Sequence, residues 1–98
     1  MITLENIKEW SRPHRHSLDG GRLTIIGNDL FDFSIVGGAN GLYGDFEKDF
    51  EVAVINRKTK EFMTAYIFST SEDVVPYLEA EELVNTLNEI LGENFQVR

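Results

Sequence analysis

The spacing of apolar residues near the C-terminus constrains the fold most strongly. Apolar residues recur there at the intervals that place side chains on one face of a helix. These residues are Leu83, Val84, Leu87, Ile90 and Leu91. Gly92 is typical of the residue that follows the end of a helix. The pattern predicts an amphipathic helix over residues 79–91, whose apolar face must be covered by another part of the chain.

Pro76 lies just ahead of this helix. Residues 71–75 carry a helix-start signal, but proline is poorly tolerated in a helix interior because it lacks the amide hydrogen and clashes with the preceding turn. We therefore expect a separate helical turn over residues 72–78.

The segments upstream have the period of strands. Phe31, Phe33 and Ile35 alternate with polar residues, which is typical of a half-buried strand. Segments rich in β-branched and aromatic residues and bounded by turn residues are typical of strands. Four strands are expected in this way, over residues 22–26, 31–35, 46–55 and 61–69. The first two should pair as a hairpin, and residues 56–60 should form the polar tip between the last two.

A short helix is expected at the N-terminus, over residues 4–10. Thr3 can cap it, Ile2 and Ile7 are spaced as a hydrophobic staple, and Pro13 requires the helix to end before it. The chain is thus predicted to be one α+β domain spanning residues 1–98. It should hold a four-stranded antiparallel β meander with the short N-terminal helix and the longer C-terminal helix packed on one face. The other face should be open to solvent or to a partner.

The charge of the chain limits its partners. With 17 acidic against nine basic residues, the net charge is -8, so direct binding to nucleic acid or to an anionic membrane is disfavoured. There is no cysteine, which removes disulfides and thiolate chemistry. No signal peptide or spanning segment is recognised, so the expected location is the cytoplasm.

Residues 34–47 hold a glycine-rich stretch that superficially resembles a phosphate-binding loop. A Walker loop needs Lys followed by Ser or Thr after its last glycine, whereas here Gly44 is followed by Asp45. A dinucleotide-binding loop leads into a helix, and this one leads into acidic residues. The stretch is therefore interpreted as a connection between the second and third strands, with positive φ angles at Asn40 and Gly41. Tyr43 at its tip is a candidate contact residue.

Acidic residues follow the glycines at alternate positions. Asp45, Glu47, Asp49 and Glu51 should share one face of the third strand, with a spacing of about 6.6 Å. A second acidic region lies along or beside the C-terminal helix, with Glu79, Glu81 and Glu82 as its candidate contact residues. Its other members are Glu72, Asp73, Glu89 and Glu93. Two interpretations stay open: a solvated face that keeps the domain soluble, and a docking surface that steers a basic partner.

Metal binding and catalysis are disfavoured. The segment from Asp45 lacks the glycine that a calcium-binding EF-hand loop requires at its sixth position, where Phe50 stands. His14, His16 and Asp19 could together surround a divalent metal ion. The arginines near the two histidines disfavour a cation there, so a surface loop is the expected structure. No serine has the sequence context of a catalytic nucleophile, so enzymatic activity is not expected. No metal or cofactor is expected either.

In size, acidity, lack of cysteine and predicted elements, the chain resembles the small acidic inhibitors of bacteriophages and mobile elements, among them anti-CRISPR proteins and DNA mimics. The resemblance spans the chain but rests on no motif, so it assigns no residue. It implies a stoichiometric inhibitor that occupies the basic nucleic-acid groove of a host or defence protein. The alternatives are an immunity or antitoxin-type protein that neutralises a basic toxin, and a structural or regulatory homodimer whose acidic face is merely exposed to solvent. A homodimer could also form if the basic segment around His14 met the acidic row of a second copy.

Overall fold

The computed structural model describes residues 1–15, 20–39 and 42–98. Its helices are α1 (Leu4–Glu9), α2 (Thr64–Phe68) and α3 (Ala80–Leu91). Its strands are β1 (Arg12–Pro13), β2 (Arg22–Gly27), β3 (Phe31–Gly37), β4 (Asp49–Asn56), β5 (Val75–Glu79) and β6 (Gln96–Val97). Five strands follow one another in the order β1-β2-β3-β4-β5, β6 pairs with β2, and every pairing is antiparallel. The α+β class and the antiparallel meander order are thus confirmed, but the meander has five strands and β6 is added to it, where four strands were expected.

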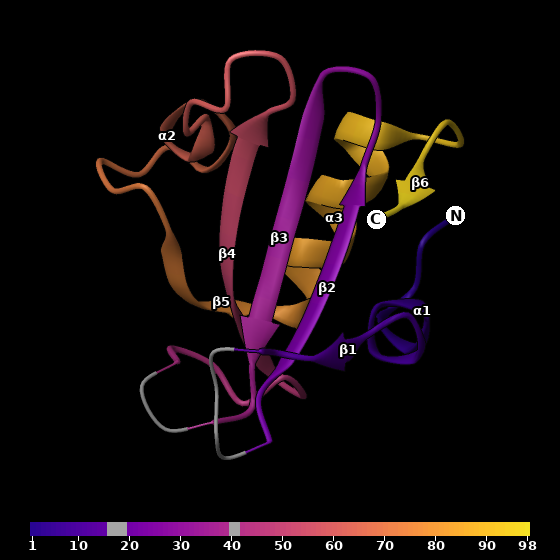
Figure 1. Cartoon of the computed structure of the whole chain (residues 1–98), viewed down its shortest axis with the longest axis vertical. Coiled ribbons are helices and arrows are strands. Elements are labelled where there is room, and N and C mark those ends of the chain that lie inside the picture. The colour runs from indigo at the N-terminus through magenta and orange to yellow at the C-terminus, as the bar shows by residue number, and fades with distance from the viewer. Residues whose placement is uncertain (16–19, 40–41) are drawn as a thin grey trace.

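Helix α3 covers one face of the sheet (Figure 1). Its apolar side consists of Leu83, Leu87 and Leu91, which are buried in one cluster with residues that point from the sheet toward the helix. The sheet residues of this cluster include Ile26, Phe33, Ile35, Phe50, Val52 and Val54. The predicted C-terminal helix, with Gly92 at its end, is confirmed. None of the three helices in the described part of the chain lies in front of the opposite face in Figure 1.

The N-terminal helix is also confirmed, one residue shorter than expected. The Thr3 hydroxyl accepts the amide hydrogen of Asn6, and the Asn6 side chain accepts that of Thr3, which closes a capping box. Ile2 and Ile7 are fully buried in the core. The hydroxyl of the buried Thr24 donates to the carbonyl of Ile7 at 2.6 Å, which ties α1 to strand β2.

The outer edge of β2 is covered by two short strands that the sequence did not predict. Strand β1 pairs with β2 at Arg22 and Leu23, and β6 pairs with it at Ile26 and Gly27. Between these pairings the amide of Arg98 donates to the carbonyl of Ile25 at 2.7 Å. This edge of the sheet is therefore closed to strand addition.

The strand expected over residues 61–69 is wrong. Only one bridge, between Ile55 and Phe62, extends the pairing beyond β4, and α2 follows. The buried hydroxyl of Thr64 accepts the amide hydrogen of Val54 at 2.9 Å and donates to the carbonyl of Asp73 at 2.6 Å. The side chain of Thr64 thus takes the place of a strand partner, and the chain turns into a helix there.

The helical turn expected over residues 72–78 is also wrong, because this segment supplies strand β5. Leu78 pairs with Phe50 and is buried, so tertiary packing overrides the local helix-start signal. Pro76 is tolerated because β5 is the last strand in the sheet order, where one amide hydrogen is not needed. The pairing is irregular between Phe50 and Val52, and Tyr77 has a φ of 52°.

The glycine-rich stretch connects β3 to β4, as predicted. The amide of Gly38 donates to the carbonyl of Gly44 at 2.9 Å, which folds the loop back on itself. A Cβ atom at Gly44 would lie 2.7 Å from the Cα atom of Phe50, so only glycine fits at this contact. Asn40 and Gly41, expected to adopt positive φ angles, lie outside the described residues. None of the helices within residues 1–15, 20–39 and 42–98 has the length and hydropathy that a bilayer-spanning segment requires.

The close contact at Gly44 makes a testable prediction. Gly44→Ala should lower the free energy of unfolding by about 3 kcal/mol, the upper part of the range for overpacking, because the opposing atoms are backbone atoms. Gly20→Ala is the control, since it has open space around it but a φ of 84°, and it should cost only about 1 kcal/mol of backbone strain. Urea denaturation measures both. Equal losses in the two variants would contradict the packing described at Gly44.

Candidate functional site

The candidate acidic residues gather at the end of the sheet where β4 begins and α3 starts. The amide of Ala80, the first residue of α3, donates to the carbonyl of Lys48 at 3.0 Å. The amide of Tyr77 donates to the carbonyl of Tyr43 at 2.8 Å. These two hydrogen bonds hold loop 42–48 beside β5 and the first turn of α3.

The acidic row expected on one strand is not formed. Strand β4 begins only at Asp49, so Asp45 and Glu47 lie in the loop before it. The Asp45 carboxylate accepts three backbone amide hydrogens, from Glu47 and Lys48 at 2.8 Å and from Asp49 at 3.2 Å. In return the Asp49 carboxylate accepts the amide hydrogen of Asp45 at 2.8 Å. Two of the four predicted carboxylates therefore stabilise the loop itself, which is the structural role of short acidic side chains in turns.

The hydrogen bonds to Asp45 lower its pKa below the ordinary value of 3.8. The amides of Glu47 and then Lys48 are the largest causes, because a backbone amide stabilises the ionised form of the carboxylate it binds. Asp45 is consequently ionised throughout the physiological range of pH.

The remaining two members of the row have different partners. Glu47 forms an ion pair with Lys8 of α1 at 2.5 Å. Glu51 is half-buried, and its carboxylate accepts the amide hydrogen of Tyr43 at 3.2 Å. A negative charge remains at each of Asp45, Asp49 and Glu51, since their described partners are neutral amides.

Tyr43 is exposed, as predicted, and it packs against Tyr77, which was not predicted. The ring centroids are 5.8 Å apart, with exposed fractions of 51% for Tyr43 and 60% for Tyr77. Rings exposed in this way are the kind of side chain that anchors protein interfaces. Tyr77 was missed because residues 72–78 were expected to be helical, and only the pairing of β5 brings it beside Tyr43.

Glu79 lies directly opposite Asp49 in the pairing of β4 and β5. Like charges directly opposite one another on neighbouring strands are destabilising. No described Lys or Arg forms an ion pair with either of them. This pair adds to the negative potential at the start of α3.

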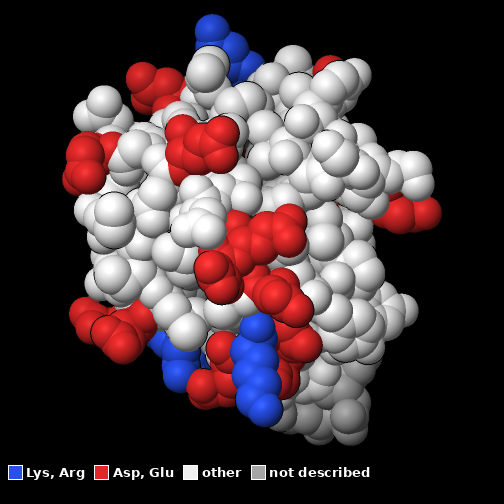
Figure 2. Space-filling view, turned by 180° about the vertical axis from the view of Figure 1, so that it is seen from behind, with Lys and Arg blue, Asp and Glu red and all other residues white. Residues whose placement is uncertain are grey.

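Helix α3 carries the second group of acidic residues on its solvent side. Glu81 and Glu82 lie exposed in its first turn, and Glu89 is exposed in its last turn, which contains no basic residue. We call Glu81, Glu82 and Glu89 the α3 acidic face. Figure 2 views the molecule from the side of α3 and shows Asp and Glu side chains in a band down the middle of this surface, with a Lys or Arg side chain at its lower end. Glu89 was predicted as a member of the second acidic region but not as a contact residue, although its spacing from Glu82 on a helix could have indicated that role.

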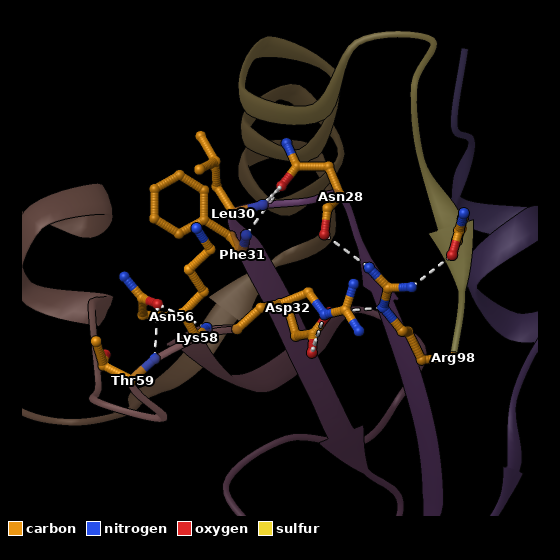
Figure 3. A network of polar contacts seen from close by, with 10 residues as sticks. Asn28, Leu30, Phe31, Asp32, Asn56, Lys58, Thr59 and Arg98 are labelled. Carbon is orange, nitrogen blue, oxygen red and sulfur yellow. Dashed lines mark hydrogen bonds and ion pairs between the residues drawn. The ribbon is translucent and has the colours of Figure 1, made fainter.

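The opposite end of the sheet has a different charge pattern, with arginines around one carboxylate (Figure 3). Arg98 donates to the carboxylate of Asp32 at 2.8 Å and to the carbonyl of Asn28 at 2.6 Å. Arg57 lies 3.7 Å from the other Asp32 oxygen. Two arginines are thus used to hold β6 and the turn after β4 against the sheet, away from the candidate acidic surface.

Within residues 1–15, 20–39 and 42–98, no group of three His, Asp or Glu side chains is placed to hold a metal ion. His14 is half-buried beside β1, while His16 and Asp19, which were weighed with it as ligands, lie outside the described residues. The arrangement at the acidic end offers charge and aromatic surface, which suits binding to another protein.

The role of Asp45 in the loop leads to a prediction. Because folding lowers its pKa, Asp45 stabilises the folded protein above its ordinary pKa, and this stabilisation is lost as the pH falls through the lowered value. Asp45→Ala should therefore cost about 1 kcal/mol at neutral pH, as the loss of a capping side chain does, and less in acid. Chemical denaturation over a pH series measures this. Glu72→Ala, which removes another exposed carboxylate, is the control. If Asp45→Ala lowered the free energy of unfolding equally at every pH, the ionised Asp45 carboxylate would not be what stabilises the loop.

Comparisons with family models, with curated proteins and with solved structures gave no match for this chain. The function is therefore inferred from the charge, exposure and geometry of its own residues.

Proposed function

We propose that this protein is a stoichiometric inhibitor that binds a basic surface of another protein and blocks access of nucleic acid to that surface. The observation that carries the proposal is the α3 acidic face, with an exposed glutamate at each end of the helix. No described cation pairs with these three side chains, so their charge is available to a partner.

Helix stability alone does not account for this face. Glu81 and Glu82 lie near the positive end of the helix dipole and stabilise it. Glu89 lies near the negative end, where an acidic residue is unfavourable and a basic one would be favoured. A carboxylate at a position where it lowers the stability of its own helix is explained if it binds a partner protein.

The acidic residues of α3 lie along one side of a single rigid element. Glu82 and Glu89 are separated by seven residues, or about 10.5 Å of helix rise. Carboxylates held along a helix in this way can occupy a groove whose cations otherwise bind phosphates. Tyr43 and Tyr77 supply exposed aromatic surface at the adjoining end of the sheet, where charge alone would give little affinity.

The expected origin of the inhibitor follows from its size and charge. A small acidic binder of this type is suited to a bacteriophage or mobile element, and its target is then a host or defence protein in the cytoplasm of the host cell. The net charge of -8 supports a basic target because it accelerates association with a positive surface.

Neutralising the α3 acidic face tests the proposal. The variant Glu81→Gln, Glu82→Gln, Glu89→Gln should bind the partner at least about tenfold more weakly, from roughly 0.5 kcal/mol for each charge pair. The partner is captured from a lysate, identified by mass spectrometry and purified, and its affinity is measured by calorimetry. The same purified partner should lose its nucleic acid when the wild-type protein is added.

The matched control is Glu61→Gln, Glu72→Gln, Asp73→Asn, which removes the same charge from the segment between β4 and β5. Its affinity should stay within about twofold of the wild type. Equal weakening in the two variants would show that only net charge matters. A partner that binds this protein and nucleic acid at the same time would refute the inhibitory mechanism.

A further inference from the structure

A shallow apolar groove lies between the start of α1 and the first two turns of α3. It has a volume of about 370 Å³, and almost all of its accessible lining is apolar. The residues that line it are Met1, Ile2, Thr3, Leu4, Ala80, Glu81, Val84 and Asn85. Glu81 belongs both to this lining and to the α3 acidic face, so groove and acidic face are continuous.

The walls of the groove are fixed by hydrogen bonds and burial. The Asn88 side chain accepts the amide hydrogen of Ile2 and donates to its carbonyl, both at 2.8 Å. Ile2 itself is fully buried in the core, whereas Leu4 and Val84 are half-buried. A groove with walls held in this way can bind without ordering its own residues first, which favours affinity.

The charges around the groove restrict its occupant. Glu81 lines it, and Glu5 is exposed on α1 beside Leu4. None of the lining residues is Lys or Arg, and the N-terminal ammonium of Met1, which also lines the groove, is paired with Glu93 at 3.3 Å. A second copy of this chain would bring an acidic rim against an acidic rim, and an anionic lipid surface would be repelled. The complementary occupant has an apolar side chain for the groove and cations for its rim.

We infer that this groove receives the apolar side chains of a basic amphipathic segment of the partner protein, with Lys or Arg next to them that contact Glu5, Glu81 and Glu82. The inference rests on the proposed function, because it names the chemistry of the partner that the α3 acidic face binds. It adds that recognition depends on apolar contact as well as charge. A nucleic-acid-binding surface made only of charge would then be a poor target.

Two synthetic peptides test this inference. One repeats pairs of lysine and leucine, and the other has serine at every leucine position and the same charge. The leucine peptide should bind at least about tenfold more tightly, since burial of even one large apolar side chain contributes that much. In spectra of the ¹⁵N-labelled protein, the leucine peptide should shift the amide signals of Leu4, Ala80 and Val84.

Variants at the groove separate packing from charge. Val84→Gln should remove the preference for the leucine peptide. The matched control Ile90→Gln changes another half-buried residue of α3 outside the groove and should keep the preference. Thermal unfolding of both variants shows whether they fold, and the spectra of the wild-type protein test the inference even when a variant does not.

Two outcomes would overturn the inference. Equal affinity for the two peptides, with shifts only at Glu81, Glu82 and Glu89, would refute the groove and leave the charge-based function standing. The same shifts at Leu4 and Val84 on raising the protein concentration alone would show that a second copy fills the groove. A third outcome would instead refute the proposed function. In it, Val84→Gln weakens binding of the purified partner, while the variant Glu81→Gln, Glu82→Gln, Glu89→Gln binds that partner as tightly as the wild type.

Discussion

The burial of α3 against one face of the sheet is the packing that the rest of the structure depends on. Leu83, Leu87 and Leu91 share the core with aromatic and β-branched residues of β3 and β4. Each large side chain buried in this way contributes roughly 1.5–3 kcal/mol, so these contacts dominate the stability of a chain of this length. Because a single layer of helix covers the sheet, the far side of α3 necessarily faces solvent. The acidic residues on that side are free of packing constraints and can be selected for charge.

The acidic residues of this chain have two different roles. Asp45 and Asp49 bind backbone amides and shape the loop, so their charge is partly a by-product of local structure. Glu81, Glu82 and Glu89 make no such contacts among the described residues, and Glu89 opposes the helix dipole. A carboxylate without a hydrogen-bond or ion-pair partner among the described residues is the better candidate for contact with another molecule. This distinction moves the candidate interface from the strand row to the helix.

Most of the fold could be predicted where one periodic signal acted alone. The period of Leu83, Leu87 and Leu91 located α3, and the alternation of Phe31, Phe33 and Ile35 located β3. The two elements of the wrong type lie between residues 61 and 79, where local preference and tertiary pairing disagree. Strands β1 and β6 were also missed, because two residues carry no periodic pattern, and β4 begins at Asp49, later than expected. The Thr64 hydroxyl and the burial of Leu78 decide that region, and neither contact is visible in a pattern of single residues. Tyr77 was missed for the same reason, because its place beside Tyr43 depends on the pairing of β5. Glu81 and Glu82 were correctly placed in the C-terminal helix, because its periodic pattern predicted that helix.

The central claim is that charge on α3 draws this protein to a basic partner. The most direct measurement is the rate constant for association of the purified pair as a function of ionic strength. Electrostatic steering is screened over a Debye length of about 8 Å at physiological salt, so the association rate should fall steeply as salt is added, while the dissociation rate changes much less. An association rate that is independent of salt would contradict the claim.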